Sequence, residues 1–114
     1  MPYVKIETTK EMDTDVLGTF SKKVSSFVAN MLSKPETYIM VSISKPDKML
    51  LGGDELPSVY MLLKSINLPV ERCSEFTQKL CDFFELELRI QADRIYIDFS
   101  DIDRKCFGWN RQTF

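Results

Sequence analysis

The sequence predicts an α/β (α+β) fold, in which two βαβ repeats form a four-stranded mixed sheet with two helices on one face. Three observations predict it. The segments run strand, helix, strand and then repeat this order; each helical segment carries one apolar stripe; and 114 residues suit a single domain spanning 1–114. Because each crossover should be right-handed, both helices should cover the same face.

The first repeat begins with residues 2–7, where polar and apolar residues alternate as in a strand. Asp13 or Thr14 is a good helix N-cap. A helix of about five turns should follow, since apolar residues recur at spacings of three and four. They are Leu17, Phe20, Val24, Phe27 or Val28, and Met31. Lys34-Pro35 should end it, because a residue before proline is disfavoured in the helical region.

Residues 38–44 are rich in β-branched side chains and predict the next strand, and residues 45–53 form a connection with a Gly-Gly turn signal. Residues 59–66 are apolar nearly throughout, which suits a strand covered on both faces.

Pro69 suits the first turn of a second helix. Its apolar stripe comprises Cys73, Phe76, Leu80, and Phe83 or Phe84. Residues 95–99 predict the last long strand, and residues 107–109 a short one. Two helices cover only one sheet face, while the strands carry apolar residues in both phases. An open apolar face on a small chain predicts self-association.

Composition argues against several classes of function. The net charge is −2 and Lys and Arg are scattered, so we expect neither nucleic acid nor an anionic membrane as a partner. The first fifteen residues lack the apolar core of a signal peptide, and no stretch approaches a membrane span. Three cysteines without CxxC spacing indicate neither a disulfide framework nor a zinc site. We therefore expect a cytoplasmic protein.

The chain has no histidine, which removes the usual general base and the commonest metal ligand. Acid–base chemistry at neutral pH must then come from a carboxylate, Lys, Tyr, Cys or the terminal amine.

An ordered set of motifs spans the whole chain and resembles the macrophage migration inhibitory factor (MIF) family of the tautomerase superfamily. The motifs are Met1-Pro2, Lys34-Pro35 with Tyr38, Gly52-Gly53, Ser65-Ile66, Asp93-Arg94-Ile95-Tyr96-Ile97, Gly108-Trp109-Asn110 and Thr113-Phe114. The resemblance implies a homotrimer with sheets around a central channel, and keto–enol tautomerase activity of the phenylpyruvate or dopachrome type, an isomerase reaction on enolisable 2-keto acids. It implies no cofactor. Some relatives are secreted by a non-classical route and act as cytokines on cell-surface receptors.

The resemblance also implies roles for individual residues. Pro2, once Met1 is removed, would be the catalytic base, because a buried terminal amine near a cation has a lowered pKa. Lys34 would hold the substrate carboxylate and lower that pKa, and the backbone N–H of Ile66 would bind a substrate oxygen.

Four aromatic side chains would form the pocket walls: Tyr38, Tyr96, Trp109 and Phe114. Two positions depart from the family. Asp98 replaces a common Asn, so its carboxylate would repel an anionic substrate or keep Pro2 protonated. Asn67 replaces a usual Gly and should change the pocket mouth.

Two other functions are open. One is a cytokine-like signalling or interaction protein whose tautomerase pocket is vestigial. The other is a ferredoxin-like regulatory or RNA-binding module, which ranks last because no RNP-like run of basic and aromatic residues occurs. Metal binding is disfavoured, since Asp98, Asp101 and Asp103 have no His or paired Cys beside them.

Overall fold

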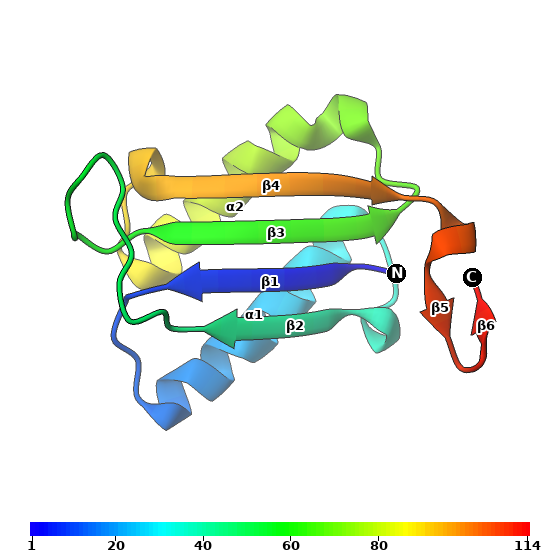
Figure 1. The fold of residues 1–114 in the computed structure, drawn as a ribbon, viewed down its shortest axis with the longest axis horizontal. Helices are drawn as coiled ribbons and strands as arrows, with labels where there is room; N and C mark the ends of the chain where they lie inside the picture. Colours follow the sequence, from blue (N-terminus) through cyan, green and yellow to red (C-terminus); the bar gives the residue numbers. More distant parts are fainter.

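The structure is a computed structural model that describes residues 1–114, and it has two repeats of strand, helix and strand (Figure 1). The elements are β1 (Tyr3–Thr8), α1 (Thr14–Leu32), β2 (Met40–Ser44), β3 (Val59–Ile66), α2 (Cys73–Leu88) and β4 (Ile95–Ile102). The strand order is β2-β1-β3-β4, with β1 antiparallel to β3 and a parallel pair at each edge. The predicted mixed sheet is confirmed.

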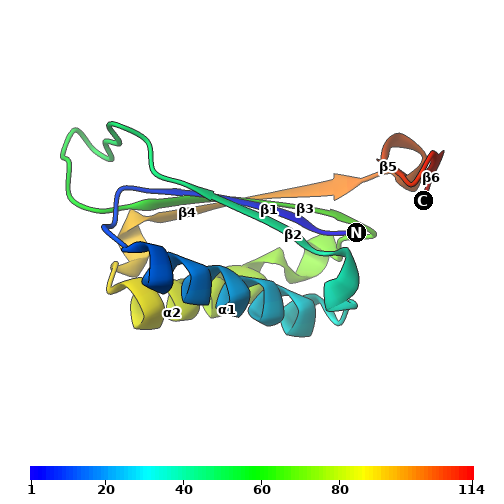
Figure 2. The same cartoon turned by 90° about the horizontal axis from the view of Figure 1, so that it is seen from below.

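Both helices pack on one face of the sheet and leave the other bare (Figure 2). The core lies between these layers, because the two apolar helix stripes meet the alternate residues of the strands that point toward them. Phe76 and Phe84 are fully buried there, against Ile6 and Met61 from the central strands. Burying a side chain of this size contributes about 2–3 kcal/mol. Neither helix combines the length and apolar composition that a membrane crossing requires.

The ends of α1 direct the chain back to the sheet. Asp13 is the N-cap, and its Oδ1 accepts a hydrogen bond from the Val16 N–H at 2.8 Å. At the other end Ser33 has the left-handed φ of 54°, and the Lys34 N–H donates to the Ala29 carbonyl at 3.0 Å. The left-handed residue ends the helix and turns the chain away from the helix axis. Lys34 therefore begins the connection to β2.

Several predicted boundaries move. Tyr38 lies in a short 3₁₀ turn, η1 (Glu36–Tyr38), so β2 begins two residues later than expected. Pro69 does not lie in the first turn of α2: its ψ of 89° is non-helical, and it precedes a separate 3₁₀ turn, η2 (Val70–Arg72). β4 continues three residues beyond the predicted end because it stays paired with β3 as far as Ile102.

The chain ends in a hairpin beside the N-terminus (Figure 1). A 3₁₀ turn, η4 (Arg104–Cys106), leads into β5 (Gly108–Trp109) and β6 (Gln112–Thr113). Asn110 and Arg111 form the turn, with φ of 52° and 69°. Positive φ at both positions is typical of a type I′ hairpin. The expected strand near 107–109 is thus one arm of a small ribbon.

The bare sheet face mixes apolar and charged side chains. Tyr60 and Leu62 are half-buried, and Met40 and Tyr96 are exposed, but Lys5 and Glu7 lie between them as an ion pair at 3.5 Å. Strand β3 is therefore fully covered on one face only, contrary to the expectation for residues 59–66. The expected association would have to cover a partly polar surface.

Candidate functional site

Two cavities open at the end of the sheet where both chain termini lie. One has a volume of about 230 Å³ and the other about 340 Å³. Four residues line both: Met1, Pro2, Tyr38 and Phe114. The smaller cavity also contains the polar side chains of the site, whereas the larger is mainly hydrophobic, with five aromatic residues among the eleven that line it. We call them the cationic and the aromatic cavity.

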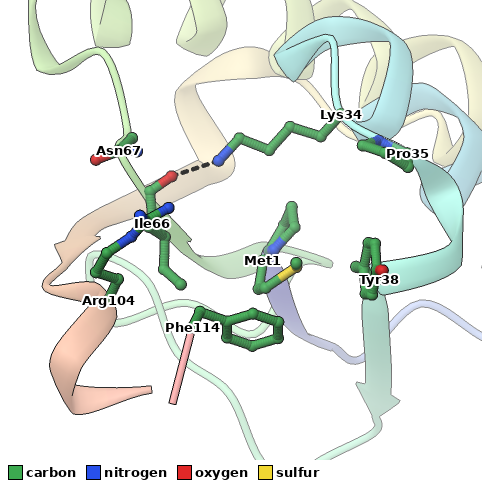
Figure 3. A pocket seen from close by; sticks show the side chains of 9 residues that line it. Met1, Lys34, Pro35, Tyr38, Ile66, Asn67, Arg104 and Phe114 are labelled. Atoms are coloured by element: carbon green, nitrogen blue, oxygen red, sulfur yellow. Dashed lines mark hydrogen bonds between the residues drawn. The ribbon is translucent and has the colours of Figure 1, made fainter. Parts of the chain in front are cut away.

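Pro2 is fully buried at the boundary between these cavities. Its carbonyl oxygen accepts a hydrogen bond from the Met40 N–H at 3.1 Å, which fixes the residue at the start of β1 and beside β2. Figure 3 shows the Met1 side chain in the cavity. While Met1 is attached, the proline nitrogen is an amide without basicity; removal of Met1 would convert it into a secondary amine facing both cavities.

Lys34 enters the cationic cavity from the end of α1 (Figure 3). Its Nζ donates to the Ser65 hydroxyl at 2.8 Å and to the Ile66 carbonyl oxygen. Two of its three N–H donors are thus engaged within the chain. Sequence reasoning placed Lys34 and Ile66 in the same site, and the structure brings them into direct contact.

Two pKa values near the terminus are lowered, mainly by burial. Burial lowers the pKa of Lys34, and the Asp101 carboxylate partly opposes this. The pKa of the Met1 amino group is also lowered, first by burial and then by the Lys34 charge. Burial and a neighbouring cation both disfavour the charged form of an amine.

Asn67 forms part of the rim of the cationic cavity and follows β3 directly. Its φ is 57°, in the left-handed region that glycine favours and that asparagine tolerates better than most residues. The next residue, Leu68, is held by a hydrogen bond from its N–H to the Asp101 carboxylate at 3.1 Å. Asparagine therefore meets the same backbone requirement as the family's usual glycine and adds an amide to the rim.

Arg104 also lines the cationic cavity, from η4, and sequence reasoning missed it. It is an isolated basic residue near the C-terminus, and no spacing or motif marks it. The end of β4 and the η4 turn bring it to the site, since the strand register places Pro2 level with Asp101, three residues before Arg104.

The aromatic cavity is built from the tail packed against η1. Trp109 and Phe114 are stacked, with ring centroids 5.6 Å apart and planes 7° apart. The Tyr38 ring meets both edge-on, at 5.6 Å and 6.3 Å. Edge-to-face and stacked contacts are favourable aromatic geometries. These three predicted wall residues do gather, and Phe107 joins them at 5.6 Å from Phe114.

Tyr96 and Asp98 do not lie in either cavity of the chain. The strand register places Pro2 level with Asp101, five residues beyond Tyr96, which is about 16 Å along the sheet. Tyr96 is 59% exposed on the bare face. Asp98 accepts a hydrogen bond from the Tyr60 hydroxyl at 2.7 Å, which is the main cause of a raised Tyr60 pKa. Both residues remain predicted site residues that a single chain cannot bring to Pro2.

The fold and site together define a small α+β domain whose terminal amine is held beside a cation at one end of a sheet. The sequence model described as "Macrophage migration inhibitory factor (MIF)" matches residues 1–114. The chain therefore belongs to the MIF family, a branch of the tautomerase superfamily that includes tautomerases and proteins with cytokine-like roles.

Individual relatives agree with this assignment. A "Macrophage migration inhibitory factor homolog" of Brugia malayi is 34% identical over 115 residues, covering 100% of this chain and 99% of the relative. The solved MIF structure from Trichinella spiralis has a TM-score of 0.89 at 32% identity, covering 98% and 99% of the two chains. A MIF homologue from Prochlorococcus marinus has a TM-score of 0.86 at 34% identity, covering 98% of each. The similarity thus extends over the whole fold.

Proposed function

We propose that this protein is a keto–enol tautomerase acting on aryl 2-keto acids such as phenylpyruvate, with Pro2 as its base once Met1 is removed. The observation that carries the proposal is the position of Pro2. It lies buried beside Lys34, at the boundary between a cationic and an aromatic cavity. A substrate with an anionic end and an aromatic end fits that arrangement.

The reaction needs a base at the carbon next to the keto group. The Pro2 amine in its neutral form would take a proton from this carbon, and the electron pair of the C–H bond would form the C=C bond of the enol. The resulting ammonium would then give its proton to the former keto oxygen, so no proton is gained or lost overall. General base catalysis of this kind contributes about 10²–10⁴-fold to a rate.

Charge develops on the keto oxygen during proton transfer, and the cationic cavity supplies donors for it. Lys34 retains one free N–H after its bonds to Ser65 and Ile66, and its charge would also help to lower the pKa of the amine. The Ile66 backbone N–H is the other proposed donor. Donors already fixed in place stabilise the enolate without reorganisation.

A homotrimer would complete the site. The bare sheet face carries Tyr96 and Asp98 far from the chain's own Pro2, so only a neighbouring subunit could supply them. In that arrangement Tyr96 would extend the aromatic wall and Asp98 would add a carboxylate. Sedimentation of the purified protein should then give about three times the chain mass of 13.3 kDa.

The test is enolisation of phenylpyruvate and hydroxyphenylpyruvate, followed by ultraviolet absorbance. The protein is used after mass spectrometry shows that Met1 is absent. Pro2→Gly should lower turnover by about 10²–10⁴-fold. Asp98→Asn should raise turnover, because a carboxylate repels an anionic substrate, and Tyr60→Phe is its control because it removes only the partner of Asp98.

Absence of turnover in correctly processed trimer, or turnover indifferent to Pro2→Gly, would contradict the enzyme proposal. Receptor binding by an inactive trimer would then identify the cytokine-like role as the function of the protein.

A further inference from the structure

Arg104 is a cation in the cationic cavity, and its side chain makes no polar contact within the chain. Its side chain has neither an ion pair nor a hydrogen bond, although seven ion pairs form elsewhere. The neighbouring Asp103 carboxylate is directed to the Lys105 N–H, at 2.9 Å, and not to the guanidinium. Five N–H donors are therefore free at the mouth of the proposed active site.

Lys34 differs from Arg104 in each respect. It is half-buried, its Nζ donates twice within the chain, and the Asp101 carboxylate lies close enough to act on its charge. Its position is therefore set by the fold before any ligand arrives. The nine residues lining the cavity include no Asp or Glu, so the Arg104 charge has no neutralising group in the lining.

We propose that Arg104 is the principal binding residue for the substrate carboxylate, while Lys34 acts mainly on the Pro2 amine and the keto oxygen. The proposal rests on the proposed function, since it assigns a residue to that reaction. A guanidinium matches a carboxylate with two parallel N–H···O bonds, which a lysine cannot form. Figure 3 shows Arg104 and Lys34 approaching the cavity from different elements, so each can contact a different part of one ligand.

The enzymatic test compares phenylpyruvate with its methyl ester, which lacks the carboxylate charge. In Met1-free protein, Arg104→Ala should lower kcat/KM for the acid by about 10- to 100-fold, mainly through KM. It should change the ester by less than about twofold, because the ester offers no anion. Arg104→Lys should recover part of the loss, since it keeps the charge but not the planar pair of donors.

Lys105→Ala is the matched control. It lies in the same 3₁₀ turn, removes the same charge and lies outside the cavity. It should leave the acid-to-ester ratio unchanged. The unfolding midpoints of both variants should match that of the parent, because neither side chain holds the fold together.

A binding experiment separates this proposal from the reaction itself. Phenylacetate and phenylacetamide have the same shape but differ in charge, and neither requires turnover. Titration followed by heteronuclear NMR should show tighter binding of phenylacetate, and Arg104→Ala should abolish the preference. If the parent turns over no 2-keto acid yet shows this preference, the proposed function fails and the anion site stands.

Two results would overturn the proposal. One is an acid-to-ester ratio in Arg104→Ala equal to that of Lys105→Ala. The other is loss of trimer in both Arg104→Ala and Asp98→Asn with that ratio intact, which would mean that Arg104 pairs with a neighbouring subunit's Asp98.

Discussion

The two halves of the molecule share one construction and differ at one connection. Both helices end on a residue with left-handed backbone, Ser33 with φ of 54° and Arg89 with φ of 59°, and both continue into a 3₁₀ turn before the edge strand. The residue after the left-handed position is Lys34 in the first half and Ile90 in the second. Ile90 is 3% exposed in the core, whereas Lys34 reaches into a cavity.

The two ends of the sheet also differ in how their connections are held. In the second half, Arg94 at the end of η3 (Ala92–Arg94) holds the loop that precedes β3. It donates to the Leu56 and Pro57 carbonyls at 2.8 Å and 3.0 Å and pairs with Asp54 at 2.9 Å. In the first half the corresponding turn ends in Tyr38, which meets the aromatic tail. One end is therefore closed by packing and hydrogen bonds, and the other is left open as a site.

Ile90→Lys should cause the largest effect, because it places an unpaired charge where the second half has core. The free energy of unfolding should fall by about 3–5 kcal/mol. Urea denaturation measures it. Lys34→Ile is the reciprocal control and should cost less than half as much. Equal losses in the two variants would show that the halves are not built differently at this position.

Arg94→Ala should release the loop at the closed end, since its side chain makes three polar contacts there. We expect a loss of about 2–3 kcal/mol in unfolding free energy, and faster amide exchange confined to residues 45–58. Arg94→Lys keeps the charge but loses the planar guanidinium. Its unfolding free energy should lie between those of the parent and Arg94→Ala. Unchanged exchange in the loop would mean that the contacts do not hold it.

Lys34→Ile should change the pH dependence of the open end. Loss of the Nζ donor at the Ile66 carbonyl should cost about 1–2 kcal/mol of stability. The proposed base works only when unprotonated, so kcat/KM rises with pH through the pKa of the amine. A nearby cation lowers that pKa, so its removal should move the rising limb to higher pH. Turnover of the methyl ester against pH checks this, and a limb that stays in place or moves to lower pH would contradict it.

Asn67 offers the smallest effect. Asn67→Gly should leave stability within a few tenths of a kcal/mol, because both residues accept the left-handed φ of 57°. Asn67→Val should lower the free energy of unfolding by about 1 kcal/mol, since a β-branched residue does not readily adopt a left-handed φ. Thermal unfolding distinguishes the two variants. An unchanged unfolding midpoint in Asn67→Val would show that the backbone at this position relaxes to a different φ.

Much of the fold could be predicted because each element has a local cause. Asp13, the apolar stripes and the strand alternation act within a few residues, so their positions follow from spacing. The errors at Tyr38 and Pro69 lie where a 3₁₀ turn joins a helix or strand, since such turns have no long periodic signal. The end of β4 was set by pairing with β3, a contact between distant residues.

The candidate site was predictable only in part, for the same reason. The family resemblance indicated five residues that line the cationic cavity: Pro2, Lys34, Ile66, Tyr38 and Phe114. Arg104 was missed because its place depends on the η4 turn and on the end of β4, which is set by pairing with β3. Tyr96 and Asp98 lie far from Pro2 within one chain, and only the proposed trimer would bring them to the site. Contacts between residues that are distant in the sequence, or in different subunits, therefore could not be predicted from local sequence patterns.

The meeting of both chain termini at one cavity boundary restricts how the protein can be handled in the laboratory. Residues fused before Met1 would block the proline nitrogen, and residues fused after Phe114 would crowd both cavities. Under the proposed mechanism, an affinity tag at either end would therefore give folded protein without tautomerase activity. The exposed Gly52-Gly53 turn lies at the opposite end of the sheet, and an insertion there would leave the chemistry undisturbed (Figure 1).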